Sequence, residues 1–92
     1  MNNLFISYDL NAPGQRYEAV AAAIKTLGNW AKLQKSFWYV KSSCTAAQAV
    51  DRVWAAMDRN DSVIVVDATN RQAAWKGIDP TVAQHILDNW EK

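Results

Sequence analysis

The chain has 92 residues, of which half are hydrophobic and 21% are charged, and its formal net charge is +1. A chain of this length buries about 60–65% of its unfolded surface, which suffices for one domain around one core. The composition excludes a disordered chain, and the near-neutral charge argues against strong nonspecific binding to nucleic acid, because that affinity comes chiefly from Lys and Arg. We therefore expect a single domain over residues 1–92.

No segment of the sequence is expected to enter a membrane. The longest apolar run, residues 19–24, has six residues, whereas a membrane-spanning helix needs about 20. The first residues lead directly into a strand-like run, without the charged and apolar regions of a secretory leader. The single cysteine, Cys44, cannot form an intramolecular disulfide, which fits a reducing compartment and predicts a packed thiol. These features predict a cytoplasmic protein with no membrane partner.

The first half of the chain predicts a strand, a helix and a longer extended region. Residues 4–9 carry apolar side chains on both faces, which predicts a central strand. Apolar residues at helical spacing predict a helix over residues 17–27, which ends at Gly28. Over residues 30–42 the apolar alternation changes parity near Ser36, which predicts a bulge or a break between two strands.

The second half predicts a helix, a strand and a tail. Thr45 and Gln48 have the spacing of a capping box at the start of a helix. Residues 62–67 are a short apolar run, which is typical of a buried strand. Residues 72–77 predict a small edge strand. Residues 78–92 predict a peripheral C-terminal helix, because an Asp-Pro pair stands near its beginning.

The order of the main elements predicts an α+β domain of the ferredoxin-like class. In this β-α-β-β-α-β arrangement an antiparallel sheet carries both helices on one face, here with the short edge strand and the C-terminal helix added. The other face is expected to be uncovered and to present Phe5, Ser7 and Asp9, together with some of Phe37, Trp38 and Tyr39. Exposed apolar area of this kind usually marks a partner surface. A homodimer that packs sheet against sheet is the simplest way to bury it.

Several motifs, taken in their order and spacing, resemble one known group of proteins. They look like the small CRISPR-associated ferredoxin-like nuclease and adaptation subunit, and virulence-associated protein D is similar to the same group. A closer resemblance is to the SinR-like branch of small stand-alone bacterial proteins, and it covers nearly the whole chain. The CRISPR-associated resemblance is carried by Tyr8-Asp9, Arg16, Gly28 and residues 34–38 and 61–64, and the SinR-like one by residues 6–10, 13–15, 36–40 and 75–77.

This resemblance implies a function at the end of the first strand. In the CRISPR-associated family the aspartate at that position is a proposed divalent-metal ligand, and two copies approach each other across a homodimer; the matching residue here is Asp9. The resemblance implies cleavage of phosphodiesters in RNA or double-stranded DNA with Mg²⁺ or Mn²⁺, or a dimer that binds nucleic acid without cleaving it. The competing interpretation is a non-catalytic dimer that regulates or binds a protein partner.

The residues themselves leave two roles open for Asp9. Mg²⁺ prefers oxygen ligands and keeps several waters, so a strand-end carboxylate suits it. Asp67 also ends a strand, but it is expected roughly 15–20 Å away at about 3.3 Å per residue, whereas a twofold axis would supply a second Asp9. Alternatively, the Asp9 carboxylate accepts backbone N–H groups in a turn over residues 11–14.

Basic residues in the first half predict an anion-binding face. Residues 1–46 contain five basic and two acidic residues, whereas residues 47–92 contain five basic and seven acidic ones. Arg16 stands near a helix start, where backbone N–H groups favour phosphate. Lys32 and Lys35 interleave with aromatic residues, as in proteins that bind single strands. The alternative is that the aromatic side chains are buried and the cations are solvated surface charges.

Overall fold

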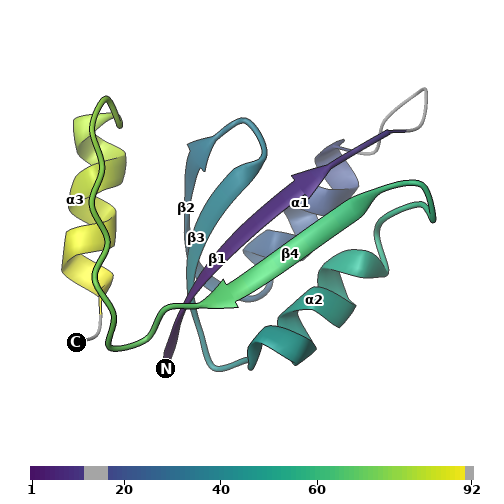
Figure 1. The fold of residues 1–92 in the computed structure, drawn as a ribbon, viewed down its shortest axis with the longest axis horizontal. Coiled ribbons are helices and arrows are strands. Elements are labelled where there is room, and N and C mark those ends of the chain that lie inside the picture. Colours follow the sequence, from purple (N-terminus) through teal and green to yellow (C-terminus); the bar gives the residue numbers. More distant parts are fainter. Residues whose placement is uncertain (12–16, 91–92) are drawn as a thin grey trace.

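The computed structural model describes residues 1–11 and 17–90, which form four strands and three helices (Figure 1). The elements are β1 (Asn2–Asp9), α1 (Tyr17–Lys25), β2 (Gly28–Gln34), β3 (Phe37–Ser42), α2 (Ala46–Trp54), β4 (Ser62–Asp67) and α3 (Pro80–Asn89). The chain is therefore an α+β protein, as its sequence predicts. None of the helices in the described ranges is long and apolar enough to cross a membrane.

All four strands form one antiparallel sheet in the order β2-β3-β1-β4. The strand β1 is central, as its two apolar faces predicted, because it pairs with β3 on one side and β4 on the other. The predicted break near Ser36 is confirmed, since β2 and β3 form a hairpin that turns at Lys35 and Ser36. The pairing of this hairpin is irregular between Lys32 and Gln34.

One face of the sheet, which we call the inner face, packs against α1 and α2. Leu4 and Ile6 of β1 are fully buried there, together with Val40 of β3. Ile24 of α1 and Val53 of α2 are also fully buried in this core. Both helices therefore cover the same face, which was predicted from the order of the elements.

Of the three aromatic residues considered for the open face, Trp38 belongs instead to the inner core. It is 2% exposed, and its indole N–H donates to the Tyr8 hydroxyl at 3.2 Å. Successive side chains of a strand point to opposite faces, so Trp38 and Val40 share one face while Tyr39 points to the other. The apparent change of parity arises because Leu33 packs on the outer side of the sheet and not in the inner core.

The helix α2 begins with the capping box that the sequence predicted. The Thr45 hydroxyl accepts the Gln48 N–H at 3.1 Å, and the Gln48 side-chain oxygen accepts the Thr45 N–H at 2.9 Å. These bonds satisfy N–H groups that have no partner within the helix, and such a cap is worth about 1 kcal/mol. The cap therefore fixes where the chain leaves β3 and enters α2.

The chain enters β2 through a close approach at Gly28. A Cβ atom at this position would lie 2.0 Å from the backbone oxygen of Lys41, so a larger residue does not fit. Beside it, the buried Ser42 hydroxyl donates to the Leu27 carbonyl at 2.6 Å and accepts the Cys44 N–H at 3.0 Å. Cys44 is 5% exposed, which confirms the packed thiol.

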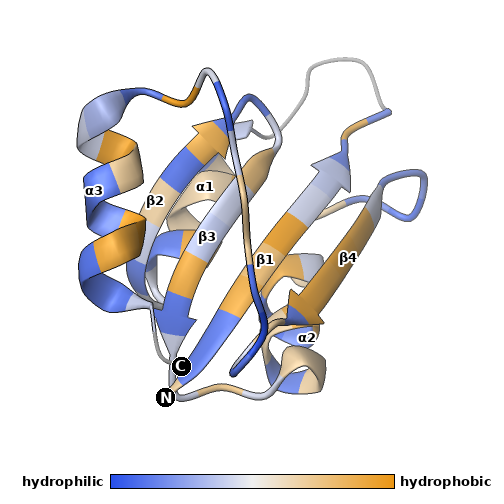
Figure 2. Ribbon diagram, turned by 60° about the vertical axis from the view of Figure 1, so that its left-hand side comes forward, coloured by the Kyte–Doolittle hydropathy of each residue, from blue (hydrophilic) through white to orange (hydrophobic). Residues whose placement is uncertain are grey.

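The opposite, outer face of the sheet is partly covered by the C-terminal part of the chain. The connection from β4 to α3 crosses the sheet on this face (Figure 2), and we call residues 70–78 the crossing segment. Between it and the sheet lies a second core around Ala31, Tyr39 and Ile86. Phe5, Leu33, Trp75, Val82 and Trp90 pack against this core.

Two expectations for this tail are therefore wrong. Residues 72–77 form no strand, because Trp75 packs onto the outer core instead of alternating along a sheet edge. The helix α3 is not peripheral, since Ile86 is 1% exposed. Its start is as predicted, because the Asp79 carboxylate accepts the Thr81 N–H at 2.9 Å and Pro80 is the first helical residue. The apolar outer side of β1–β3 provides the partner that this amphipathic helix requires.

Within the described residues, the part of the outer face on β4 remains open. Ile64 and Val66 are 60% and 48% exposed there, while the alternate residues Val63 and Val65 pack against the inner core. The strand β4 is also an edge strand, because it pairs only with β1. In Figure 2 it is largely orange. The predicted open apolar face is thus reduced to this edge.

Candidate functional site

Asp9, the predicted metal ligand, is the last residue of β1 and is exposed. Its Cα partner on β4 is Ser62. Because side chains alternate along a strand, Asp9 lies on the outer face together with Phe5 and Ser7. Among the described residues, no hydrogen bond engages its carboxylate. Its position therefore leaves this charge facing solvent at the rim of the sheet.

The hairpin between β2 and β3 brings Lys35 to the same end of the sheet. The Tyr8 N–H donates to the Ser36 carbonyl at 3.1 Å, so the hairpin turn lies beside the residue that precedes Asp9. Lys35 is exposed in this turn. In Figure 1 the end of β1 and the hairpin turn both lie at the upper side of the sheet. We call this place, with its exposed carboxylate and ammonium groups, the Asp9 end.

A second aspartate at the Asp9 end has a structural role. Asp61 is 9% exposed, and its two carboxylate oxygens accept the N–H of Asn11 at 2.8 Å and that of Asp58 at 2.9 Å. These bonds tie the segment after β1 to the turn before β4. The alternative role considered for Asp9, binding of backbone N–H groups, is therefore carried at Asn11 by Asp61. The rest of that predicted turn, residues 12–14, lies outside the described residues.

Two further residues, Arg16 and Lys32, were predicted to bind anions. Arg16 lies outside the described residues. Lys32 is opposite Trp38 in the pairing of β2 with β3, and its ammonium group lies 5.6 Å from the centroid of that ring. Lys25 makes a similar cation–π contact with Trp30 at 4.6 Å. Of the predicted cations in the described ranges, Lys35 accompanies Asp9, whereas Lys32 is placed on the inner side of β2.

The aromatic residues that lie among the lysines are mostly buried, so most of their surface is not available for stacking on a base. Trp38 and Tyr39 are 2% and 0% exposed, on opposite faces of the sheet. Trp30 is 40% exposed, but its ring packs against Trp38 with the centroids 5.4 Å apart. The alternative interpretation, in which aromatic side chains between the lysines are part of the core, is therefore correct for Trp38 and Tyr39.

For binding a metal ion, the Asp9 end offers the exposed carboxylate of Asp9. Over residues 1–11 and 17–90, no three His, Cys, Asp or Glu side chains are grouped closely enough to hold a metal ion. Asp67 is opposite Leu4 in the pairing of β4 with β1, which places it about 17 Å from Asp9 at about 3.3 Å per residue. Mg²⁺ is commonly bound through one or two carboxylates, with waters and substrate phosphates as its other ligands. Asp9 fits such an ion when a substrate phosphate or a second copy of the chain completes the site.

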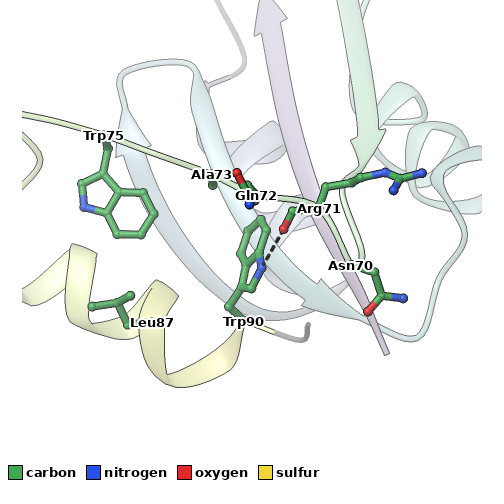
Figure 3. Close-up of a pocket in the computed structure, with 7 residues that line it drawn as sticks. All are labelled: Asn70, Arg71, Gln72, Ala73, Trp75, Leu87 and Trp90. Carbon is green, nitrogen blue, oxygen red and sulfur yellow. Dashed lines mark hydrogen bonds between the residues drawn. The ribbon is translucent and has the colours of Figure 1, made fainter.

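Described residues line two cavities on the outer face, and the larger of these is an open groove of about 610 Å³ along the crossing segment (Figure 3). Trp75, Leu87 and Trp90 contribute its apolar walls. The Trp90 indole N–H donates to the Arg71 carbonyl at 3.2 Å and so ties the end of α3 to the crossing segment. The Arg71 side chain extends away from Trp75 (Figure 3), so its charge does not face the part of the groove beside that indole.

The smaller cavity, of about 340 Å³, lies where the crossing segment and α3 meet the sheet. Its walls are mainly apolar, and Gln34 and Lys76 add polar groups. The sequence predicts an edge strand over residues 72–77, whereas residues 73–76 of this segment form one wall of the cavity. The single local signal was Trp75, a large apolar residue among small and polar neighbours. The apolar residues that contribute to the walls include Phe5, Leu33, Phe37, Trp75, Ile78 and Ile86.

Comparison of the sequence with models of protein families gives no match, and comparison with curated proteins gives none. The resemblance to the SinR-like branch and to the CRISPR-associated subunit therefore stays a prediction. The geometry of the Asp9 end, with its exposed carboxylate, its lysine and the nearby open strand β4, is the basis for assigning a function.

Proposed function

We propose that the chain is a ferredoxin-like domain that associates with nucleic acid as a homodimer and cleaves phosphodiesters with a divalent metal held by Asp9. The fold assignment is supported by the order of the first six elements, by the central position of β1 and β3, and by the common face of α1 and α2. The activity is supported by one observation, the exposed Asp9 carboxylate at the same end of the sheet as Lys35.

The chemistry of phosphodiester hydrolysis fits these groups. The reaction needs an activated water and stabilisation of the negative charge on the phosphate, which Mg²⁺ or Mn²⁺ supplies when bound. Asp9 is the ligand that this chain contributes. Lys35 adds a point charge that attracts a phosphate oxygen. The hydrogen bonds of Asp61 to Asn11 and Asp58 hold the backbone around the site.

A homodimer through the open part of β4 brings two copies of Asp9 towards each other. Ile64 is opposite Ser7 in the pairing of β4 with β1. Asp9 lies two residues further along β1 on the same outer face, a distance of about 7 Å. In a twofold interface a residue near the axis faces its own copy. Two carboxylates per dimer then match the number that Mg²⁺ commonly binds in proteins.

The proposed activity predicts a measurable effect of removing the Asp9 charge. The purified 92-residue chain is incubated with labelled RNA and with duplex DNA, in Mg²⁺, in Mn²⁺ and in EDTA. We expect metal-dependent cleavage that Asp9→Asn lowers at least about 100-fold, because even residues that only orient a metal ligand are worth about 10–100-fold. Asp51→Asn is the matched control, since it removes an exposed carboxylate on α2 and should leave the rate unchanged.

Equal inactivity of the wild type and Asp9→Asn would reject cleavage. Gel-shift titrations of the same samples then separate the remaining classes. A shift that weakens as the salt concentration rises indicates a dimer that binds nucleic acid without cleaving it, and Lys35→Ala should weaken that shift further. No shift at low salt rejects the nucleic-acid assignment and favours the competing class, a non-catalytic dimer that regulates or binds a protein partner.

A further inference from the structure

We infer that the smaller cavity on the outer face binds a nucleobase. A nucleotide bound here would have its base between the sheet and the crossing segment and its phosphate towards the Asp9 end. This inference rests on the proposed function, because it identifies which part of the nucleic acid the protein holds next to Asp9.

The cavity lies close to the Asp9 end and on the same face of the sheet. Phe37, which contributes to its wall, is opposite Ser7 in the pairing of β3 with β1. Asp9 is two residues beyond Ser7, or about 7 Å along the strand. Gln34, another wall residue, directly precedes Lys35 of the hairpin turn. A phosphate held at Asp9 or Lys35 is therefore next to the cavity and not across the molecule from it.

The aromatic walls suit a flat ring. Phe5 and Phe37 are stacked on each other, with their centroids 5.6 Å apart and their planes 10° from parallel, and Trp75 contributes from the crossing segment. Nucleobases stack on aromatic side chains in proteins that bind unpaired strands, because every base has a π-face. The volume of about 340 Å³ lies within the range of about 300–1,000 Å³ that is usual for small-molecule sites.

The two polar side chains match different parts of a nucleotide. The Gln34 amide offers both donors and an acceptor, which is what recognition of a base edge requires. Lys76 is exposed and offers a cation to a phosphate. An apolar acid would use Lys76 but would leave the donors and acceptor of Gln34 unused. The observations therefore favour a nucleotide over a simple apolar anion.

Calorimetric titration of the 92-residue chain tests this inference directly. The ligands are AMP, GMP, CMP and UMP, with ribose 5-phosphate as a ligand that lacks the base and benzoate as a flat apolar acid. We expect at least one nucleotide to bind saturably, at least about tenfold more tightly than ribose 5-phosphate, as stacking of one base predicts. Failure of every nucleotide to exceed ribose 5-phosphate overturns the inference, and so does benzoate binding as tightly as the best nucleotide.

Two variants locate the binding. Ala74→Phe places a ring in the cavity wall and should weaken the best nucleotide at least about tenfold. Its control is Ala55→Phe, at an exposed position that caps the end of α2. Gln34→Leu keeps a side chain of similar size but removes the amide. It should therefore change the order in which the four nucleotides are preferred. Unchanged binding in both Ala74→Phe and Gln34→Leu would overturn the inference.

The variant Asp9→Asn separates this inference from the proposed function. It should lower cleavage at least about 100-fold, and in EDTA it should leave the affinity for nucleoside monophosphates within about twofold, because a carboxylate holds a phosphate only through a bound metal ion. Cleavage by the wild type without any binding of the monophosphates leaves the nuclease proposal in place and rejects the base site. Binding of a monophosphate without cleavage rejects the nuclease proposal alone.

Discussion

At the scale of single residues, Tyr39 and Asn3 form a polar pair that joins β3 to β1. Both residues are fully buried, and the Tyr39 hydroxyl donates to the Asn3 side-chain oxygen at 2.8 Å. The Asn3 backbone also binds the chain after β4, because its N–H donates to the Thr69 hydroxyl at 3.0 Å and its carbonyl accepts the Ala68 N–H at 2.8 Å. This place therefore anchors the connection that becomes the crossing segment.

Removing the Tyr39 hydroxyl should destabilise the protein. In Tyr39→Phe the Asn3 oxygen loses this donor inside the protein, so we expect the free energy of unfolding to fall by about 1–3 kcal/mol. The control is Tyr17→Phe, because Tyr17 is 49% exposed and such surface changes are usually within about 0.5 kcal/mol. Urea unfolding monitored by circular dichroism measures both variants. Equal stability of the two variants would contradict this role of the Tyr39 hydroxyl.

Single residues also show which parts of the site are predictable from sequence. The strand-end position of Asp9 was predictable, because the apolar alternation of β1 stops there. The role of Asp61 was not, since its partners Asn11 and Asp58 are brought to it by the pairing of β1 with β4. Local sequence identifies an aspartate beside a strand. Only the three-dimensional pairing decides whether its oxygens bind the backbone or face solvent.

At the scale of elements, strands and helices with one clear apolar pattern were predicted, whereas the crossing segment was not. The capping box of α2, the central strand β1 and the Asp-Pro start of α3 are local signals, and each is confirmed. The segment 72–77 has no such signal, and Trp75 takes its position from contacts with the outer core, which residues distant in sequence form. Tertiary packing decides its conformation, which local propensity does not indicate.

The packing of α3 on the sheet gives a second test of stability. Ile86 and Leu87 are adjacent in α3, but they are 1% and 60% exposed. Ile86→Ala opens a cavity in the outer core and should lower the free energy of unfolding by about 2–5 kcal/mol. Leu87→Ala should change it by less than about 0.5 kcal/mol, because it removes a surface side chain. Urea unfolding curves compare the two, and a similar loss in both would contradict a structural role for α3.

At the scale of the whole molecule, the two faces of the sheet are covered by different elements and to different extents. The inner face is covered by α1 and α2, and the part of the outer face on β2, β3 and β1 is covered by the crossing segment and α3. On the outer face of β4, Ile64 and Val66 are exposed, and β4 is also one of the two edge strands of the sheet. Proteins usually protect such edges against uncontrolled pairing. We propose that a second copy of the chain covers this apolar edge, which lies next to Asp9.

This explanation predicts that one charge on β4 separates the dimer. Light scattering on the wild type at micromolar concentrations should give twice the mass of the chain, and Ile64→Lys should give a single chain, because a buried unpaired charge is costly. Leu87→Lys is the matched control, since Leu87 and Ile64 are both 60% exposed, and it should remain dimeric. The Ile64→Lys protein should also lose cleavage, because the second Asp9 is no longer supplied. A monomeric wild type, or a dimer that withstands Ile64→Lys, would show that β4 is not the interface.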